Sequence, residues 1–253
     1  MDEKRSFELY SSWYDGFYED KCYEHEAQYI LEKVLKHRHP IKSWLDVGCG
    51  TGKHLACLSA TGLDVVGVDS SKQMIDRARR AFPGLPFIIG DAKSFNFKGA
   101  FNASSLLFHV VNYLGDDAHV VSSLNNIARH LDDSGILIFD FWHTPAIVDD
   151  PPHETIRSVQ VNGRTLYRIA RPTEDRAQSR VNVDYEFRFD SKAGKVIHAE
   201  RHCLRHYHCW ELAELLQSAG FALLEAEGWM THSPLTRTDW YGVIVARKMV
   251  PGS

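Results

Sequence analysis

A glycine-rich stretch near the start of the chain, residues 44–54 (Trp-Leu-Asp-Val-Gly-Cys-Gly-Thr-Gly-Lys-His), constrains the fold more than any other part of the sequence. An apolar run stops at Gly48, Gly50 and Gly52, and the apolar spacing of a helix begins at His54. This order predicts a strand, a tight turn and a helix. Glycines let the turn adopt positive φ and let a ligand approach the main chain, while the first N–H groups of the helix point toward that ligand. We therefore expect a small ligand to bind over this turn.

The spacing of these glycines excludes the two common phosphate-binding motifs. A dinucleotide fingerprint needs another glycine three residues after its second one, and the two candidate positions hold Lys53 and Leu55. A P-loop needs Ser or Thr after its lysine, whereas His54 follows Lys53. Asp46, just before the glycines, has the wrong charge for a pyrophosphate and the right charge for a cationic ligand.

Residues 45–52 (Leu-Asp-Val-Gly-Cys-Gly-Thr-Gly) resemble motif I of the class I S-adenosylmethionine-dependent methyltransferases. The resemblance implies S-adenosyl-L-methionine as the cofactor, with the glycine turn near its methionine part and Asp46 close by. Together with the strand pattern below, it predicts an α/β fold: a Rossmann-like, doubly wound, seven-stranded and mostly parallel sheet with an antiparallel β insertion after the fifth strand.

Two further acids follow predicted strands. The apolar run that ends in Asp69 predicts a second strand, and Asp69 lies about 20 residues past the first glycines, the distance at which such folds meet a ribose. A capping-box pattern from Ser70 to Gln73 predicts a helix start. The third strand, 87–89, is followed by Asp91. By resemblance to the family, Asp91 hydrogen-bonds the adenine amino group.

The loop after the fourth predicted strand, about residues 103–108, holds the candidate catalytic residues. Ligands of open α/β sheets bind at the carboxyl ends of the strands, which places His109 and Tyr113 where the methyl group is transferred. Histidine ordinarily titrates near neutrality, so His109 is the candidate base, and Tyr113 is the candidate for orienting the acceptor. The alternative is that both residues only pack the loop. An amine acceptor could react by positioning alone, whereas a hydroxyl would need a base.

Residues 149–208 interrupt the alternation of strands and helices. Asn162-Gly163 is a hairpin signal, and residues 181–189 alternate apolar with polar side chains. We therefore predict an antiparallel β insertion over 149–208 that covers the acceptor site. The cofactor-binding core is then formed by 41–148 and 209–253.

The first 40 residues are predicted to form an aromatic lid and a helix. Tyr14-Asp15-x-Phe17-Tyr18 resembles the YDxxY-type segment that folds over the cofactor in many small-molecule methyltransferases. The plainer alternative is that these aromatic side chains pack on the sheet. In all, the resemblance assigns the following residues to cofactor binding: Tyr14, Tyr18, Asp46, Gly48, Cys49, Gly50, Asp69, Ser70, Met74, Gly90, Asp91, Ala92, Leu107 and Phe108.

The arrangement of the later segments also resembles small methyltransferases that dimethylate the amine of nucleotide-linked deoxyamino sugars. This similarity implies Trp142 and Tyr207 as substrate contacts. Those enzymes carry a Ser-Gly-Arg-Gly segment before the last strand; here the segment is Thr236-Arg237-Thr238, and Arg237 does not align with their arginine. We expect the acceptor to be an amino sugar or the amine of a sugar nucleotide.

Three alternatives stay open at this point. One is O- or N-methylation of another small metabolite. A second is a protein that binds S-adenosylmethionine without turning it over. The third, a nicotinamide-dependent oxidoreductase, shares the topology but would need the missing glycine.

The net charge and the lengths of the apolar runs argue against some classes of partner. The formal net charge of −4 argues against a nucleic-acid partner, and no apolar run approaches the roughly 20 residues that span a bilayer. We expect a cytoplasmic protein with a small-molecule acceptor, and leave open whether it forms a homodimer. No disulfide is predicted from the five scattered cysteines. No metal site is predicted either from His202, His206 and His208, because strand residues two apart are already about 7 Å from each other, too far to share one zinc ion.

Overall fold

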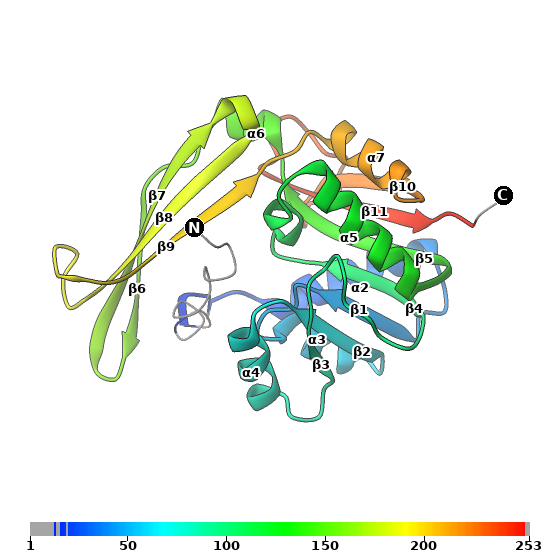
Figure 1. The fold of residues 1–253 in the computed structure, drawn as a ribbon, viewed down its shortest axis with the longest axis horizontal. Coiled ribbons are helices and arrows are strands. Elements are labelled where there is room, and N and C mark those ends of the chain that lie inside the picture. Colours follow the sequence, from blue (N-terminus) through cyan, green and yellow to red (C-terminus); the bar gives the residue numbers. More distant parts are fainter. Residues whose placement is uncertain (1–12, 14–15, 19, 251–253) are drawn as a thin grey trace.

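A seven-stranded sheet forms the centre of the computed structural model, which describes residues 13, 16–18 and 20–250. Its strand order is β10-β11-β5-β4-β1-β2-β3, and β11 runs opposite to the other six (Figure 1). The strands are β1 (Ser43–Val47), β2 (Asp64–Asp69), β3 (Phe87–Ile89), β4 (Phe101–Leu106), β5 (Leu131–Trp142), β10 (Phe221–Gly228) and β11 (Tyr241–Lys248). This confirms the predicted Rossmann-like fold class.

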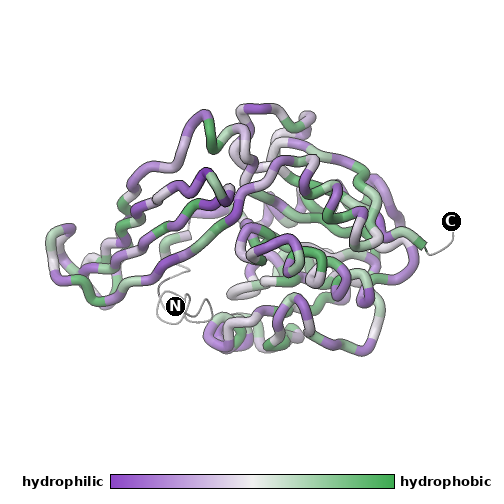
Figure 2. Tube along the Cα trace, turned by 45° about the horizontal axis from the view of Figure 1, so that its top comes forward, coloured by the Kyte–Doolittle hydropathy of each residue, from purple (hydrophilic) through white to green (hydrophobic). Residues whose placement is uncertain are grey.

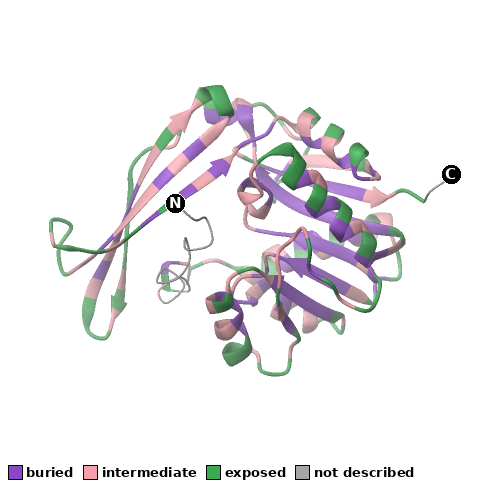
Figure 3. Ribbon diagram, in the orientation of Figure 1, coloured by how far each residue is buried: buried purple, intermediate pink, exposed green. Residues whose placement is uncertain are grey.

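Helices cover both faces of this sheet because neighbouring side chains of each strand point to opposite sides. Trp44 belongs to the apolar cluster on one face and Leu45 to that on the other, and both are fully buried. The first face carries α2 (Tyr23–His37), α3 (Lys53–Ser59) and α4 (Lys72–Ala81). The second carries α5 (Asp117–His130) and α7 (Cys209–Ser218). The buried strands therefore lie between two helical layers, as Figure 3 shows.

The chain between β5 and α7 forms a separate four-stranded antiparallel sheet beside the core (Figure 1). After α6 (Thr144–Asp149) come β6 (Thr155–Val161), β7 (Arg164–Asp175), the 3₁₀ turn η3 (Arg176–Gln178), β8 (Arg180–Phe189) and β9 (Val196–Arg205). Asn162 and Gly163 take φ values of 51° and 75°, as a tight hairpin between twisted strands requires. Polar and apolar residues alternate along these strands (Figure 2). This sheet is called the insertion below.

Several predicted boundaries differ from the structure. β5 starts at Leu131, which pairs with Phe101 of β4. The helix cap is Ser71 and not Ser70, because the Ser71 side chain accepts the Met74 N–H. β4 ends at Leu106, and the next regular element is the 3₁₀ turn η2 (Val110–Tyr113), which apolar spacing did not predict.

Membrane insertion by a helix finds no support within the described part of the chain, where every helix is too short or too polar to span a bilayer.

Candidate functional site

The glycine turn after β1 leaves its main chain open on one side. At Gly50, where φ is 54°, an added Cβ would meet no atom within 4 Å. At Gly48, where φ is 76°, an added Cβ would lie only 2.5 Å from Cγ2 of Val110. The loop that follows β4 therefore rests directly on one side of the turn, and Gly50 faces open space in which a ligand can approach the backbone.

Asp69, at the end of β2, is built into the same turn. Its Oδ2 accepts the Gly50 N–H at 2.9 Å and its Oδ1 accepts the Ser71 N–H at 2.8 Å. Burial raises the pKa of Asp69 above its ordinary value, while these two N–H donors act in the opposite direction. Each carboxylate oxygen has a second lone pair, so Asp69 can still accept from ribose hydroxyls. The open backbone at Gly50 and the hydrogen-bond acceptor Asp69 fit an adenosyl cofactor.

Asp91 follows β3 on the same edge of the sheet. Its Oδ1 accepts the Lys93 N–H at 3.0 Å, and its backbone oxygen accepts the N–H groups of Ser94 and Phe95. The side chain is thus fixed by a local turn while it stays half-buried. Its assignment to the adenine amino group stays a prediction.

Asp46 lies in β1, directly before the glycine turn. Its residue is 1% exposed, and its Oδ1 accepts the hydroxyl of Ser105 at 2.7 Å. The same hydroxyl oxygen accepts the indole N–H of Trp44 at 2.8 Å. Burial raises the pKa of Asp46 to about 6, against the lowering effect of Ser105. The carboxyl thus braces the strands beneath the turn, and its contact with the cofactor stays a prediction.

The other predicted cofactor residues divide by burial. Cys49, Met74 and Leu107 are buried, whereas Ser70 is exposed and Gly90 and Ala92 are half-buried. The Gly90 N–H donates to the Asp69 backbone oxygen at 2.9 Å. Met74 lies in the first turn of α4, and the other five residues lie within three residues of the carboxyl ends of β1 to β4. Burial alone does not test their contacts with the cofactor, which stay predictions.

The loop after β4 is held in an unusual backbone conformation. Phe108 and His109 have φ values of 66° and 64°, in the left-handed region that non-glycine residues rarely adopt. Such conformations cost on the order of 1–3 kcal/mol each and collect at functional sites. The His109 N–H donates to both carboxylate oxygens of Asp140, at 3.2 and 3.1 Å, which stabilises the turn.

His109 and Asp140 also face each other through their side chains. Nδ1 of His109 lies 2.7 Å from Oδ2 of Asp140, at ion-pair distance but without the alignment of a linear hydrogen bond. Burial of Asp140 opposes its ionisation, but the adjacent imidazole and backbone N–H of His109 hold the pKa of this carboxyl below its usual value. The imidazole is stacked between the rings of Phe108 and Tyr241, at centroid distances of 4.9 and 5.0 Å. With Nδ1 turned to Asp140, Nε2 is the nitrogen left for a substrate proton.

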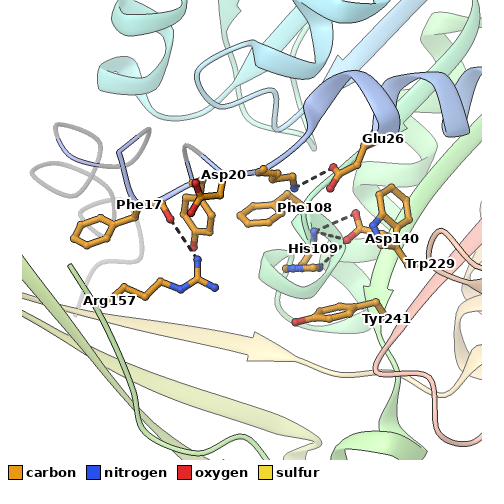
Figure 4. A pocket seen from close by; sticks show the side chains of 11 residues that line it. Phe17, Asp20, Glu26, Phe108, His109, Asp140, Arg157, Trp229 and Tyr241 are labelled. Atoms are coloured by element: carbon orange, nitrogen blue, oxygen red, sulfur yellow. Dashed lines mark hydrogen bonds and ion pairs between the residues drawn. The ribbon is translucent and has the colours of Figure 1, made fainter. Parts of the chain in front are cut away.

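This pair lines a cavity of about 370 Å³ (Figure 4). The cavity lies between the N-terminal segment, the insertion and the core, and its walls are aromatic and charged. The lining residues are Phe17, Tyr18, Asp20, Lys21, Glu26, Phe108, His109, Asp140, Arg157, Trp229 and Tyr241. Three acids, two permanently charged bases and five aromatic residues thus surround one histidine.

One of the two N-terminal tyrosines assigned to cofactor binding can be located in the structure. Tyr14 lies outside the described residues. Tyr18 lines the cavity, and its ring meets that of Phe108 edge-on at a centroid distance of 5.1 Å. Lys21 bridges the same region, because its Nζ lies 3.7 Å from the Phe108 centroid and 3.0 Å from Oε2 of Glu26.

Tyr113 is turned away from the cavity lining. Its hydroxyl lies 3.0 Å from Nδ1 of His202 in the insertion, and Nε2 of His202 lies 3.2 Å from Oε2 of Glu200. Burial raises the pKa of Tyr113 well above its ordinary value. The structure therefore separates the two predicted catalytic residues: His109 faces the cavity, and Tyr113 joins η2 to the insertion.

The two predicted substrate contacts also lie outside the cavity lining. Tyr207 is fully buried in the core cluster, and its hydroxyl donates to the Val111 backbone oxygen at 3.5 Å, which corrects its assignment to substrate. Trp142 packs behind His109, at a centroid distance of 5.8 Å. Its indole N–H is buried and meets no partner among the described residues.

The three histidines considered for metal binding have separate partners. His202 contacts Tyr113, His206 lies 2.9 Å from the Thr144 hydroxyl through Nδ1, and His208 caps α7. Among the residues the structure describes, no group of three His, Cys, Asp or Glu side chains could hold a metal ion.

Sequence reasoning missed Asp140, Trp229 and Tyr241 as cavity residues. For Asp140 a signal existed, because an acid at the end of β5 must lie beside the end of β4 in a doubly wound sheet. Trp229 and Tyr241 enter the site from the far end of the chain, and no local pattern marked them.

Comparison with known proteins shows that the chain is similar to methyltransferases. A family model described as "Methyltransferase domain" matches residues 45–135. A dTDP-3-amino-3,6-dideoxy-alpha-D-glucopyranose N,N-dimethyltransferase of Streptomyces fradiae is 29% identical over 178 residues, which cover 70% of this chain and 69% of that protein. A dTDP-3-amino-3,4,6-trideoxy-alpha-D-glucopyranose N,N-dimethyltransferase of Streptomyces venezuelae is 27% identical over 217 residues, covering 85% and 91%.

Among solved structures, the S-adenosylmethionine-bound amino pentose methyltransferase CalS10 of Micromonospora echinaspora is similar in both sequence and fold. It superposes with a TM-score of 0.75 at 26% identity, and the match covers 96% of this chain and 98% of that one. The match therefore includes the insertion as well as the nucleotide-binding core.

Proposed function

Because the chain is a class I S-adenosylmethionine-dependent methyltransferase, we propose that it methylates the amine of a deoxyamino sugar. The observation that carries this proposal is the cavity in which the paired His109 and Asp140 lie among acidic and aromatic side chains. Two relatives that share most of their length with this chain are amino sugar N,N-dimethyltransferases, which supports the same acceptor class.

The walls of the cavity favour an acceptor that arrives as a cation. Asp20, Glu26 and Asp140 carry three negative charges against the two positive charges of Lys21 and Arg157, and the rings of Trp229 and Tyr241 line the same cavity. Carboxylates and aromatic faces both attract an ammonium group. A volume of about 370 Å³ is at the lower end of small-molecule sites and suits a sugar ring better than a macromolecule.

The chain's own residues would manage the proton and the geometry. S-adenosylmethionine, when bound, supplies a methyl group on a sulfonium as the electrophile. Gly50 and Asp69 would hold its adenosyl part beside the loop after β4. His109 would accept the ammonium proton at Nε2, and Asp140 would offset the resulting positive charge through Nδ1. For an amine whose pKa is one unit above ambient pH, this deprotonation costs about 1.4 kcal/mol.

A nucleotide-linked sugar has no obvious anchor in Arg237. Its guanidinium donates to both carboxylate oxygens of Asp149 at 2.7 and 2.9 Å, on the exposed surface. The cations that line the cavity are Lys21 and Arg157. The amine is therefore the group that defines the proposed acceptor. The assay below compares an acceptor that carries a nucleotide with one that does not.

The test is a methyl-transfer assay read by mass spectrometry. The acceptors are a dTDP-linked 3-amino-3,6-dideoxyglucose, the free amino sugar and the matching sugar with a hydroxyl in place of the amine. The proposal expects one or two methyl groups on an amine-bearing acceptor and none on the hydroxyl sugar. Methylation of the hydroxyl sugar alone, or of none of the three, would contradict it.

A further inference from the structure

Two arginines face each other across neighbouring strands of the insertion. Arg157 of β6 and Arg168 of β7 are paired residues in the antiparallel register, so their side chains share one face of the sheet. Like charges in directly opposed positions destabilise a sheet. Arg168 is moreover only 4% exposed, and a buried guanidinium needs partners to offset its lost hydration.

The N-terminal segment provides partners for both guanidinium groups. Nη1 of Arg168 donates to the Tyr18 hydroxyl at 3.1 Å, and Nη1 of Arg157 donates to the Phe17 backbone oxygen at 3.3 Å. The Arg168 guanidinium also lies 5.0 Å from the ring centroid of Phe17 and 5.5 Å from that of Tyr18. These are cation–π distances, so the segment is bound to the insertion by charge and by ring contacts.

The opposite side of Tyr18 contacts the core. Its ring meets Phe108 edge-on, and Phe108 stacks on His109 in the strained loop after β4. Tyr18 is therefore held between Arg168 of the insertion and Phe108 of the core, at the wall of the cavity.

We propose that Arg168 is a positioning residue that fixes Tyr18 against the cofactor, so that the insertion supports cofactor binding as well as covering the acceptor. This rests on the proposed function and on the predicted contact of Tyr18 with the cofactor. Arg168 acts through Tyr18. The hydrogen bond and ring contact from Arg168 hold the Tyr18 phenol in the orientation that packs edge-on against Phe108. By linkage, a bound cofactor in turn strengthens the attachment of the N-terminal segment to the insertion.

The experiment is titration calorimetry of the full chain with S-adenosylhomocysteine and no acceptor. Arg168→Met, Tyr18→Phe and the double variant are compared with Arg164→Met, which lies on the same strand but forms an exposed ion pair with Asp190. Each single variant is expected to bind about tenfold more weakly, equal to about 1.4 kcal/mol. The double variant is expected to lose little more than Arg168→Met alone, because both single changes remove the hydrogen bond between Arg168 and Tyr18. Arg164→Met is expected to bind like wild type.

Two results would overturn the proposal: wild-type affinity in either single variant, or losses that multiply in the double variant. If circular dichroism shows that Arg168→Met does not fold, Tyr18→Phe together with Arg168→Lys decides the question. The lysine variant keeps a donor and a charge, and is expected to bind within about threefold of wild type. Since no acceptor is present, a wrong acceptor assignment leaves these results unchanged, whereas failure of the methyl-transfer assay concerns only that assignment.

Discussion

Nδ1 of His109 lies 2.7 Å from Oδ2 of Asp140, a carboxylate on a residue that is 2% exposed at the end of the neighbouring strand. The same carboxylate accepts the backbone N–H of His109, so one buried acid fixes both the ring and the strained loop that carries it. The arrangement gives the imidazole one defined orientation, with Nε2 available to an acceptor.

His109→Ala should lower kcat by roughly 10² or more if the imidazole accepts the acceptor proton, and it should flatten the acid limb of the pH profile. Asp140→Asn should cost about tenfold, because it removes the carboxylate that faces Nδ1 of His109 and accepts the His109 N–H. The measurement is kcat against pH on an amine acceptor. A loss of about tenfold for His109→Ala with the pH profile kept would indicate orientation alone, and wild-type kinetics would leave the loop a packing role.

Gly50→Ala should weaken S-adenosylhomocysteine binding at least tenfold, because its methyl group would occupy the open side of the turn. Gly62→Ala is the matched control: that glycine also has positive φ, 90°, and also faces open space, but it lies on the loop after α3. Both variants should lose about 1–2 kcal/mol of unfolding free energy from backbone strain, and only Gly50→Ala should lose affinity. Calorimetry and thermal melts separate the two effects. Equal affinities for the two variants would remove Gly50 from the cofactor site.

Tyr207→Phe should change stability and leave the kinetics intact. The hydroxyl is buried and donates to the Val111 backbone oxygen, so its removal should cost about 1 kcal/mol. The ring itself fills the core and is kept by phenylalanine. Thermal unfolding and steady-state kinetics on the same preparation check this. A rise in KM for the acceptor without a loss of stability would restore the substrate role that the sequence suggested.

Glu225→Gln should destabilise the protein near pH 7 and have little effect at low pH. Burial would raise the pKa of Glu225, but hydrogen bonds from Lys36 and His37 and the nearby charge of Lys33 lower it from 4.5 to about 2. A carboxyl with a lowered pKa contributes its stability above its ordinary pKa and loses that contribution as the pH falls through 4.5 toward 2. The shift corresponds to about 3 kcal/mol at most, and solvent screening of the exposed Lys36 reduces this contribution.

Urea unfolding at several pH values measures the contribution of Glu225. The exposed Glu214 of α7 provides the control variant, Glu214→Gln, for which no such pH-dependent difference is expected. A stability difference between Glu225→Gln and wild type that stays constant from about pH 7 to pH 3 would show that the ion pairs with α2 do not contribute.

Much of the fold followed from local patterns in the chain. The glycine spacing at Gly48, Gly50 and Gly52 marks a turn because few other residues adopt positive φ, and all three glycines do so. Apolar runs placed β1, β2, β3 and β4, and the turn and cap signals placed the starts of α3 and α4, to within a few residues. Asn162-Gly163 likewise predicted its hairpin. These features depend on neighbours in sequence, so the sequence alone determined them.

Only the tertiary structure decided which side chains meet. The contact of His109 with Asp140, of Tyr113 with His202 and of Tyr18 with Arg168 joins residues 31, 89 and 150 positions apart. Phe108 and His109 carry no residue signal for their positive φ, which Asp140 and the packed loop impose. The resemblance implied Tyr207 as a substrate contact, yet it lies on the segment where the chain re-enters the core and is fully buried. Long-range packing sets such positions because each depends on the register of separate strands, which local periodicity does not encode.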